Sequence, residues 1–422
     1  MESQLNIRMN VCKSWSCPNL GVTDASDYIY PVYRLGYTAL ECQKCGSLPP
    51  LFDEAECNAW FSRLMKEKLG ATGLGCPHCF NPDVIRYGKT NAGNARMQCR
   101  ACRKTFTPHQ VTPRQSENIQ QVLSQLSVGD HQSETPAYRT LTQAMGWCEG
   151  ALHDTFSVVR QIATQIFILP FQGKMAQQKL YTIVSTDADS GRVLQVSTNY
   201  SPWKTSEALC YRGGESMVQE RVNPCTVEHI RQQEGQFMQR SQFDEIDYGR
   251  AQLKENSQGC IVRPVVAIHG HFQRLKRRYP RVSDHYLMHE CMLRGAAITA
   301  WAPEVRSGAT HLWFVVEDTS EIAMPEMEFR HTGTWRIGWW TNQWQRWSRG
   351  DAHKMIALLT GQKQVVHPAA VSLRTCQQFY DWLMAHPWHQ HSGKFSARTL
   401  SAQLVCLAYS YNQQHQAVAT EK

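Results

Sequence analysis

Two cysteine pairs, Cys76-Pro-His-Cys79 and Cys99-Arg-Ala-Cys102, decide how the N-terminal part of this sequence folds. Each pair encloses two residues, and 19 residues separate the pairs. Four thiolates in this pattern match the tetrahedral coordination of structural zinc, and the interval has the length of a β-hairpin or three-stranded ribbon. We therefore predict a zinc ribbon over 70–110, against the alternative of four reduced cysteines without metal.

The interval between the pairs supports the ribbon. Residues 83–88 and 95–98 have the composition of short strands, and the turn-forming sequence Thr-Asn-Ala-Gly-Asn lies between them at 90–94. The sequence therefore supplies a hairpin that can bring Cys76 and Cys79 to Cys99 and Cys102.

An earlier group of cysteines, Cys12, Cys17, Cys42 and Cys45, has the same plan with a looser first pair. The surrounding residues repeat as well, because Glu-Cys-Gln-Lys-Cys at 41–45 matches Gln-Cys-Arg-Ala-Cys at 98–102. Such a repeat predicts tandem zinc ribbons, the first over 1–58. The alternative is a first ribbon that has lost its metal.

The composition bounds the other possibilities. With 422 residues, 42% of them hydrophobic, the chain has material for two to four domains of roughly 150 residues. No apolar run approaches the roughly 18 residues of a membrane span, and the N-terminus lacks the pattern of a secretory signal. We expect a cytoplasmic protein in a reducing compartment, where clustered cysteines indicate metal rather than disulfides.

The net charge of +8 is concentrated in the second ribbon. Between residues 76 and 115 seven basic residues stand against one acid, Asp83. Basic side chains on a small rigid module can neutralise phosphates and release counterions, which predicts sequence-independent binding of nucleic acid. A solvated ribbon surface or a protein-docking face is the alternative. The predicted DNA-binding residues are Arg86, Lys89, Arg96, Arg100, Arg103 and Lys104.

The segment 111–170 has a helical pattern. Ile119, Val122, Leu123 and Leu126 lie at helical spacing, and a second helical stretch follows over 138–152. Gly146 stands where the turn of a helix-turn-helix would lie. We predict a helix-turn-helix-like element, although short helical hairpins with glycine in the turn are common.

An α/β domain is predicted over 178–422. Residues 181–186 and 192–197 alternate as two strands of a hairpin. Further strands are expected at 261–268 and 311–316, a last long helix at about 397–411, and an insertion or helical excursion near 203–258.

The second ribbon, with Tyr87-Gly88-Lys89-Thr90 and the ending Arg96 to Thr107, resembles the N-terminal zinc ribbon of insertion-sequence transposases. In that family the ribbon precedes a helix-turn-helix and an RNase H-like domain with a DDE site. The resemblance implies a mixed fold of tandem ribbons, a helical segment and an RNase H-like C-terminal domain. Residues 265–271 resemble the strand of the family that normally ends in Asp-Gly, and residues 407–412 resemble its closing helix.

The expected DDE carboxylates are hard to place. A DDE site holds two divalent ions such as magnesium between carboxylates, but His269 stands where the second acid is expected. Asp187 and Asp189 can supply the first acid, although a hairpin turn also favours aspartate. The last acid can come from the group Glu317, Asp318 and Glu321. The catalytic residues therefore stay unassigned.

Three further groups of residues, the histidines at 269–289, the basic run 274–281 and the tryptophans at 335–347, each have a functional and a structural interpretation. Histidines 269, 271, 285 and 289 can hold a transition metal if their segments fold together, and the basic run 274–281 can contact phosphate or form a solvated helix face. Five tryptophans interleaved with arginines can stack on bases, but their spacing favours one buried face of a helix. These tryptophans are Trp335, Trp339, Trp340, Trp344 and Trp347.

These observations predict a zinc-dependent DNA-binding protein derived from a transposase, with two structural zinc ions and without strand-transfer activity. One alternative is an active DDE transposase or nuclease that uses magnesium, and another is a zinc-ribbon adaptor that binds protein. DNA is the expected partner, a membrane is not, and self-association stays open.

Overall fold

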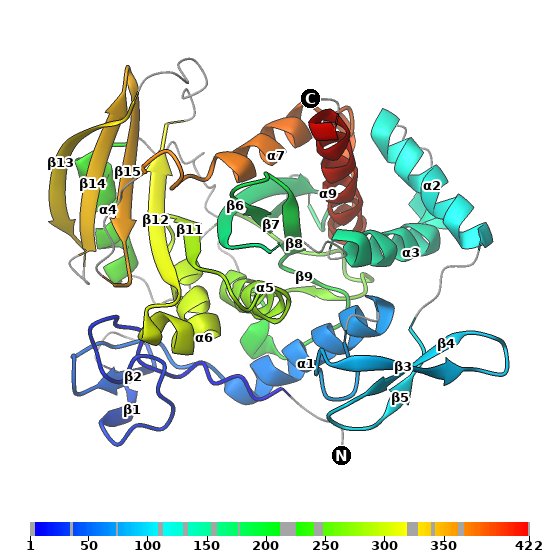
Figure 1. The fold of residues 1–422 in the computed structure, drawn as a ribbon, viewed down its shortest axis with the longest axis horizontal. Helices are drawn as coiled ribbons and strands as arrows, with labels where there is room; N and C mark the ends of the chain where they lie inside the picture. The colour runs from blue at the N-terminus through cyan, green and yellow to red at the C-terminus, as the bar shows by residue number, and fades with distance from the viewer. Residues whose placement is uncertain are drawn as a thin grey trace.

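The protein is described by a computed structural model in which most of the chain is placed (Figure 1). It describes residues 5–33, 37–72, 75–108, 113–129, 134–152, 158–175, 178–211, 225–239, 248–318, 328–338, 342–361 and 367–420. Glu321, Trp339 and Trp340, which were considered above, lie outside these residues.

A mixed sheet organises the C-terminal region. Its central strands follow the order β8-β7-β6-β11-β12, in which β6, β7 and β8 pair antiparallel and β11 lies parallel to both β6 and β12. The C-terminal region therefore has the mixed α/β fold class that was predicted. The strands are β6 (Gln161–Phe171), β7 (Gln178–Asp187), β8 (Val193–Thr198), β11 (Asp284–Met288) and β12 (His311–Glu317). The hairpin predicted around residue 189 is β7–β8, so that prediction is confirmed.

Three antiparallel strands extend the sheet beyond β12 to eight strands. They are β13 (Arg330–Ile337), β14 (Asn342–Arg349) and β15 (Ala352–Leu358). Trp335, Trp344 and Trp347, three of the five tryptophans expected on one helical face, therefore lie on strands, and the helix prediction is wrong for them. Trp335 and Trp344 are cross-strand partners, and Trp344 is fully buried. Core packing was the correct part of the interpretation, because a stripe of large apolar residues serves a sheet as well as a helix.

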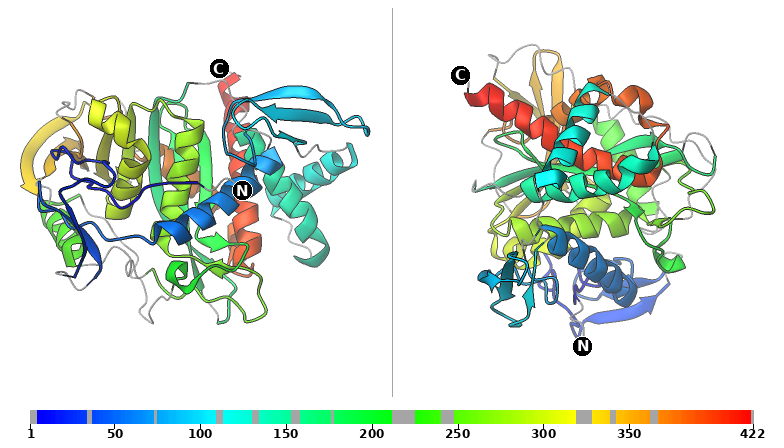
Figure 2. Two further views of the ribbon diagram at one scale, coloured as in Figure 1. Left: turned by 90° about the horizontal axis from the view of Figure 1, so that it is seen from below. Right: turned by 90° about the vertical axis from the view of Figure 1, so that its right-hand side faces the viewer.

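Helices cover both faces of the sheet (Figure 2). On one face lies α5 (Pro264–Arg278), whose His271 is hydrogen-bonded to Ser185 of β7 at 2.8 Å. On the same face, α6 (Cys291–Ser307) packs against β11 and β12. On the other face, Gln165 of β6 donates to Gln377 of α7 (Arg374–Ala385) at 3.1 Å. The long helix α9 (Ala397–Thr420) confirms the predicted C-terminal helix and packs against β8.

Residues 264–278 correct one prediction. The apolar run expected as a strand over 261–268 is mostly the first half of α5, which begins at Pro264. Val265 to Ile268 are all buried because this part of the helix is enclosed by the sheet on one side and α1 (Glu54–Thr72) on the other. A helix buried all round lacks the polar stripe that distinguishes it from a buried strand.

The helical segment differs in detail from its prediction. It consists of α2 (Pro113–Val128) and α3 (Glu134–Leu152), and α3 passes through Gly146 without a turn. The predicted turn at Gly146 is therefore wrong, because a glycine inside a helix is tolerated at a modest cost. Leu141, Ala144 and Cys148 of α3 are buried, and α3 packs against α9.

The remaining elements are short. The region predicted as an insertion contains a 3-10 turn, η1 (Glu207–Leu209), and α4 (Val227–Gln239), and it is flanked by β9 (Tyr200–Ser201) and β10 (Cys260–Ile261). A single turn, α8 (His389–Ser392), precedes α9. The first ribbon has strands β1 (Tyr28–Val32) and β2 (Ala39–Cys42), and the second has β3 (Val84–Lys89), β4 (Ala95–Cys99) and β5 (Thr105–Phe106). The domain boundaries themselves stay a prediction. Within the described residues, every helix is too short or too polar to cross a lipid bilayer.

Gly259 joins the insertion to β10 and provides a test of the packing there. Its φ is +88°, and a Cβ atom would overlap the backbone oxygen of Ser201 on the paired strand β9. Gly308, which ends α6 with a φ of +74°, has open space where its Cβ would lie. We expect Gly308→Ala to lower the free energy of unfolding by about 1 kcal/mol. Gly259→Ala adds the backbone overlap to the same strain and should cost about 3 kcal/mol.

Urea denaturation of the two variants beside the unmodified chain measures this difference. Equal losses for Gly259→Ala and Gly308→Ala would contradict the close approach of β9 and β10.

Candidate metal centres

The structure brings the eight predicted cysteines together in two groups of four. In each group the ligand atoms lie within 4.8 Å of one another. A zinc ion with four Zn–S bonds of about 2.3 Å would hold its sulfurs about 3.8 Å apart. The distances from Cys12 to Cys45 and from Cys17 to Cys42 are 3.6 and 3.7 Å, and those of the second group are 3.6 Å (Cys76 to Cys102) and 3.4 Å (Cys79 to Cys99). Each group can therefore hold one metal ion, and its donor set is that of structural zinc.

The turns that carry the cysteine pairs share one backbone geometry. Phe80 and Arg103 follow the second cysteine of their pairs with φ values of 63° and 61°. Each donates its N–H to the carbonyl of the first cysteine, Cys76 or Cys99, at 2.8 and 3.0 Å. Gly46 makes the same bond to Cys42 at 2.7 Å. Two non-glycine residues in a left-handed conformation indicate turns that the surrounding structure holds firmly.

Hydrogen bonds to sulfur favour thiolates in these turns. The backbone N–H of His78 donates to Cys76 Sγ at 3.4 Å, and that of Asn19 donates to Cys17 Sγ at 3.4 Å, but burial outweighs these bonds and raises the pKa of both thiols. For Cys45, burial acts to raise the pKa, but hydrogen bonds from Ser47 and Ser14 outweigh it and lower the pKa to about 6. Burial likewise raises the pKa of Cys102, but hydrogen bonds from Lys104 and the other three cysteines lower it to about 7. Zinc binds the thiolate form, so these contacts favour binding.

Arginines of α5 and α6 attach both ribbons to the C-terminal domain. Arg294 donates to the carbonyl of Lys13 at 3.0 Å, and Arg306 donates to that of Leu20 at 2.7 Å. Arg277 donates to the carbonyl of Phe80 at 2.6 Å and lies over its ring. Burial, and next the charge of Arg294, lower the pKa of Lys13 to about 8. The ribbons are therefore docked through the turns that hold the metal.

The sequence did not reveal these docking arginines. Arg277 belongs to the basic run that was expected to contact phosphate or solvent, but its guanidinium is committed to Phe80. Arg274 of the same run pairs with Glu149 of α3. Spacing within one helix gives no signal for a partner carbonyl almost 200 residues away.

The structure assigns structural contacts to two of the acids considered for a DDE site, Asp187 and Glu317. Asp187 accepts hydrogen bonds from Ser190 Oγ at 2.5 Å and from the N–H of Asp189, which is the contact set of a turn. Glu317 ends β12 and accepts from the N–H of Leu373 before α7, and it pairs with Lys354 at 3.1 Å. Between β6 and α7, Gln165 donates to Gln377, and the rings of Phe167 and Tyr380 are stacked.

His269 does not end a strand, so the reason given for a lost second acid is wrong. It lies in the first half of α5 and is buried against Phe52. The four histidines also do not form one site. His271 contacts Ser185 and Ser197, His285 lies edge-to-face with Trp301, and His289 contacts Glu234. Among the described residues, the two cysteine groups alone bring three or more candidate metal ligands together.

The six predicted DNA-binding residues lie on the second ribbon, as their sequence positions require. Arg86, Lys89, Arg103 and Lys104 are exposed. Arg96 donates to Thr105 at 2.9 Å, and Arg100 lies 3.8 Å from Asp83. Tyr87, between two of the basic residues, is 50% exposed.

Comparison with known proteins assigns no family. A scan of protein-family models, a search of curated proteins and a search of solved structures each gave no match to this chain.

Zinc content tests the two centres. We expect the purified chain to contain two zinc ions because each thiolate group can hold one. Cys99→Ser with Cys102→Ser should leave one ion, and Cys42→Ser with Cys45→Ser should also leave one. Elemental analysis of protein purified without added metal measures the content.

Cys57→Ala is the matched control. Cys57 is buried in α1 outside both groups, so this variant should keep two zinc ions. Less than one zinc per unmodified chain, or a content that survives both double substitutions, would contradict the assignment.

Proposed function

We propose that this chain is a zinc-dependent DNA-binding protein that derives from a transposase and lacks strand-transfer activity. The observation that supports DNA binding best is the second ribbon, a small docked module that carries exposed Arg86, Lys89, Arg103 and Lys104. These four side chains have no ionic partner among the described residues. A surface of this kind attracts phosphate backbones without reading the bases.

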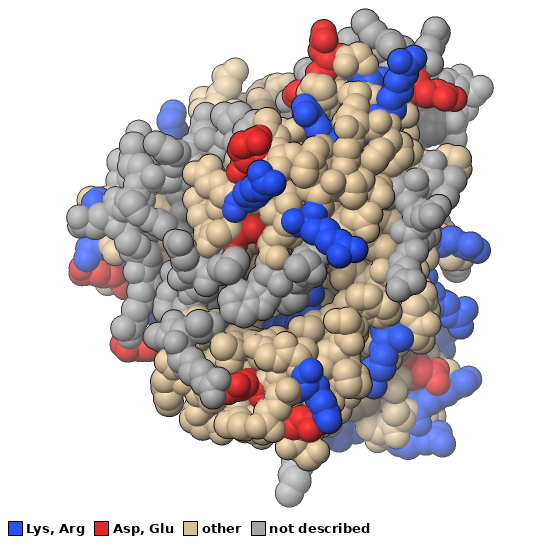
Figure 3. All heavy atoms as spheres, turned by 90° about the vertical axis from the view of Figure 1, so that its left-hand side faces the viewer, with Lys and Arg blue, Asp and Glu red and all other residues tan. Residues whose placement is uncertain are grey.

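The shape and placement of this ribbon fit that role. Its β3–β4 hairpin extends away from the C-terminal domain (Figure 2), so its basic side chains can approach a duplex. The face at the β13–β15 end differs, because its Lys and Arg side chains are mostly separated and Asp and Glu lie among them (Figure 3). The ribbon is therefore the better candidate for the DNA contact.

The transposase origin is supported by the order of the parts. Tandem ribbons, a helical segment and an RNase H-like sheet follow one another as in the family that the second ribbon resembles. The absence of strand transfer is supported by the separate structural contacts of Asp187 and Glu317, since a two-metal site needs carboxylates that converge on the ions. Among the described residues, only the two cysteine groups bring three or more candidate metal ligands together.

The first ribbon supports a second candidate function, a protein adaptor. Ile29, Tyr30 and Tyr33 are exposed by 44, 53 and 66% on its β1 side. Exposed aromatic residues are enriched where proteins contact each other. DNA binding by the second ribbon and protein binding by the first are compatible.

DNA affinity should fall steeply with salt and depend on the second ribbon. We expect Arg86→Gln with Lys89→Gln to reduce the slope of log K against log salt by about two, because each lost phosphate contact removes about 0.9. The control, Lys174→Gln with Lys179→Gln, removes the same charge from a segment outside both ribbons and should leave the slope unchanged. Fluorescence anisotropy with a labelled duplex measures both. Equal effects of the two double variants, or binding that ignores salt, would argue against the ribbon.

Plasmid nicking tests the absence of catalysis. We expect no cleavage of supercoiled DNA by the purified chain with magnesium or manganese. Metal-dependent cleavage that Asp187→Ala abolishes, while Ser190→Ala keeps it, would make the DDE nuclease the better reading, since Ser190→Ala removes a hydrogen bond but leaves the carboxylate.

A further inference from the structure

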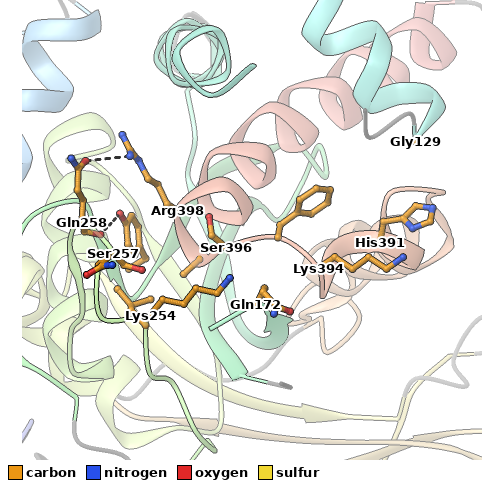
Figure 4. Close-up of a pocket in the computed structure, with 14 residues that line it drawn as sticks. Gly129, Gln172, Lys254, Ser257, Gln258, His391, Lys394, Ser396 and Arg398 are labelled. Atoms are coloured by element: carbon orange, nitrogen blue, oxygen red, sulfur yellow. Dashed lines mark hydrogen bonds between the residues drawn. The ribbon is translucent and has the colours of Figure 1, made fainter. Parts of the chain in front are cut away.

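A cavity of about 1100 Å³ lies at the start of α9, away from the metal centres (Figure 4). Segments that are far apart in sequence line it: the loop before β10, the end of β6 and the residues around the start of α9. In Figure 4, Lys254 extends towards Gln172, and Ser396 and Arg398 lie where α9 begins. No function described so far uses this cavity.

Positive charge dominates its wall. The lining residues include Lys254, Lys394 and Arg398, together with His391, and none of the fourteen is Asp or Glu. The nearest acid in sequence, Glu255, pairs with Lys174 at 3.2 Å and does not line the cavity. Neither ammonium group, of Lys254 or of Lys394, has an ionic or hydrogen-bonding partner within the described part of the chain. Cations that share a hollow without acids repel one another, and a bound anion relieves that repulsion.

The backbone adds to the same field. The helix α9 has 24 residues and begins at Ala397, in the wall of the cavity. Ser396 caps it by accepting a 3.2 Å hydrogen bond from the N–H of Thr399. The first N–H groups of a helix have no partner inside the helix, and they carry the positive end of its dipole. The charged side chains and the helix end therefore favour the same kind of ligand.

The rest of the wall suggests more than a free ion. Asn256 and Gln258 supply amide groups, and Tyr200 supplies a ring whose hydroxyl donates to the carbonyl of Gln258 at 3.1 Å. The volume is in the range of pockets that hold drug-sized molecules, which is much more than one phosphate needs.

We infer that this cavity binds the phosphate group of a nucleotide-sized phosphate ester. Lys254 and Lys394 supply charge to the phosphate, and Arg398, held by its 3.2 Å hydrogen bond to Gln258, supplies a fixed guanidinium. The amides and the Tyr200 ring are left for the remainder of the ligand. A free nucleotide and the backbone of a single strand share this chemistry.

Calorimetric titration of the full chain tests the inference with three probes: inorganic phosphate, adenosine 5′-monophosphate and a short oligothymidylate. We expect saturable binding of the monophosphate or the oligonucleotide, and weaker binding of inorganic phosphate. Lys254→Gln with Lys394→Gln should weaken that binding by at least about tenfold, because two charge-assisted contacts are lost. Lys204→Gln, at an exposed lysine that does not line the cavity, should leave it unchanged.

The source of the phosphate follows from which probe binds. To remove the contribution of the second ribbon, the oligonucleotide is titrated against the Arg86→Gln and Lys89→Gln variant as well. Thermal unfolding checks that the lysine variants keep their fold, which is expected because both side chains are exposed. Binding of none of the probes, or equal weakening by Lys204→Gln, would overturn the inference while leaving DNA binding by the ribbon intact.

Discussion

Each ribbon depends for its shape on four cysteine sulfurs arranged around a metal position, because it is too small to bury a large apolar core. The first ribbon has a small apolar cluster in which Tyr28 and Leu40 pack around three of its four cysteines. The second contributes Phe80 to the main core, while Tyr87 and its basic residues face solvent. Modules this small need a metal or a partner to stay folded. Here they have both, since the turns that carry the cysteines are also the parts that Arg277, Arg294 and Arg306 hold.

The sequence predicted the features that rest on local chemistry. Cysteine spacing located both ribbons, alternation located the β7–β8 hairpin and β12, and helical periodicity located α2 and α9. It failed where tertiary packing removes the polar face of an element. The first half of α5 is buried all round, so its apolar run was taken for a strand, and the tryptophan stripe of β13 and β14 was taken for a helix. Gly146 was taken for a turn because glycine marks turns more often than it sits within a helix.

The candidate sites divide in the same way. The eight cysteines were found because thiolate pairs carry their geometry in their spacing. The docking arginines and the cavity at α9 could not be found, since their residues come from segments as distant as Lys254 and Lys394 and meet only in the folded chain. The DDE acids show a further limit of prediction from sequence, because a correct fold prediction does not establish which catalytic residues are present. The mixed sheet forms as predicted, yet Asp187 and Glu317, two of the acids considered, are held in separate structural contacts.

Phe80, in the turn that follows Cys79, shows how few residue types can satisfy the contacts between the second ribbon and α5. Its backbone is left-handed, its N–H closes the turn of Cys76, its carbonyl accepts from Arg277 and its ring lies under the same guanidinium. Glycine would suit the backbone but remove the ring, and asparagine would tolerate the conformation but not fill the buried space. One side chain thus satisfies several independent requirements, and drift at this position is restricted even though it binds neither metal nor DNA directly.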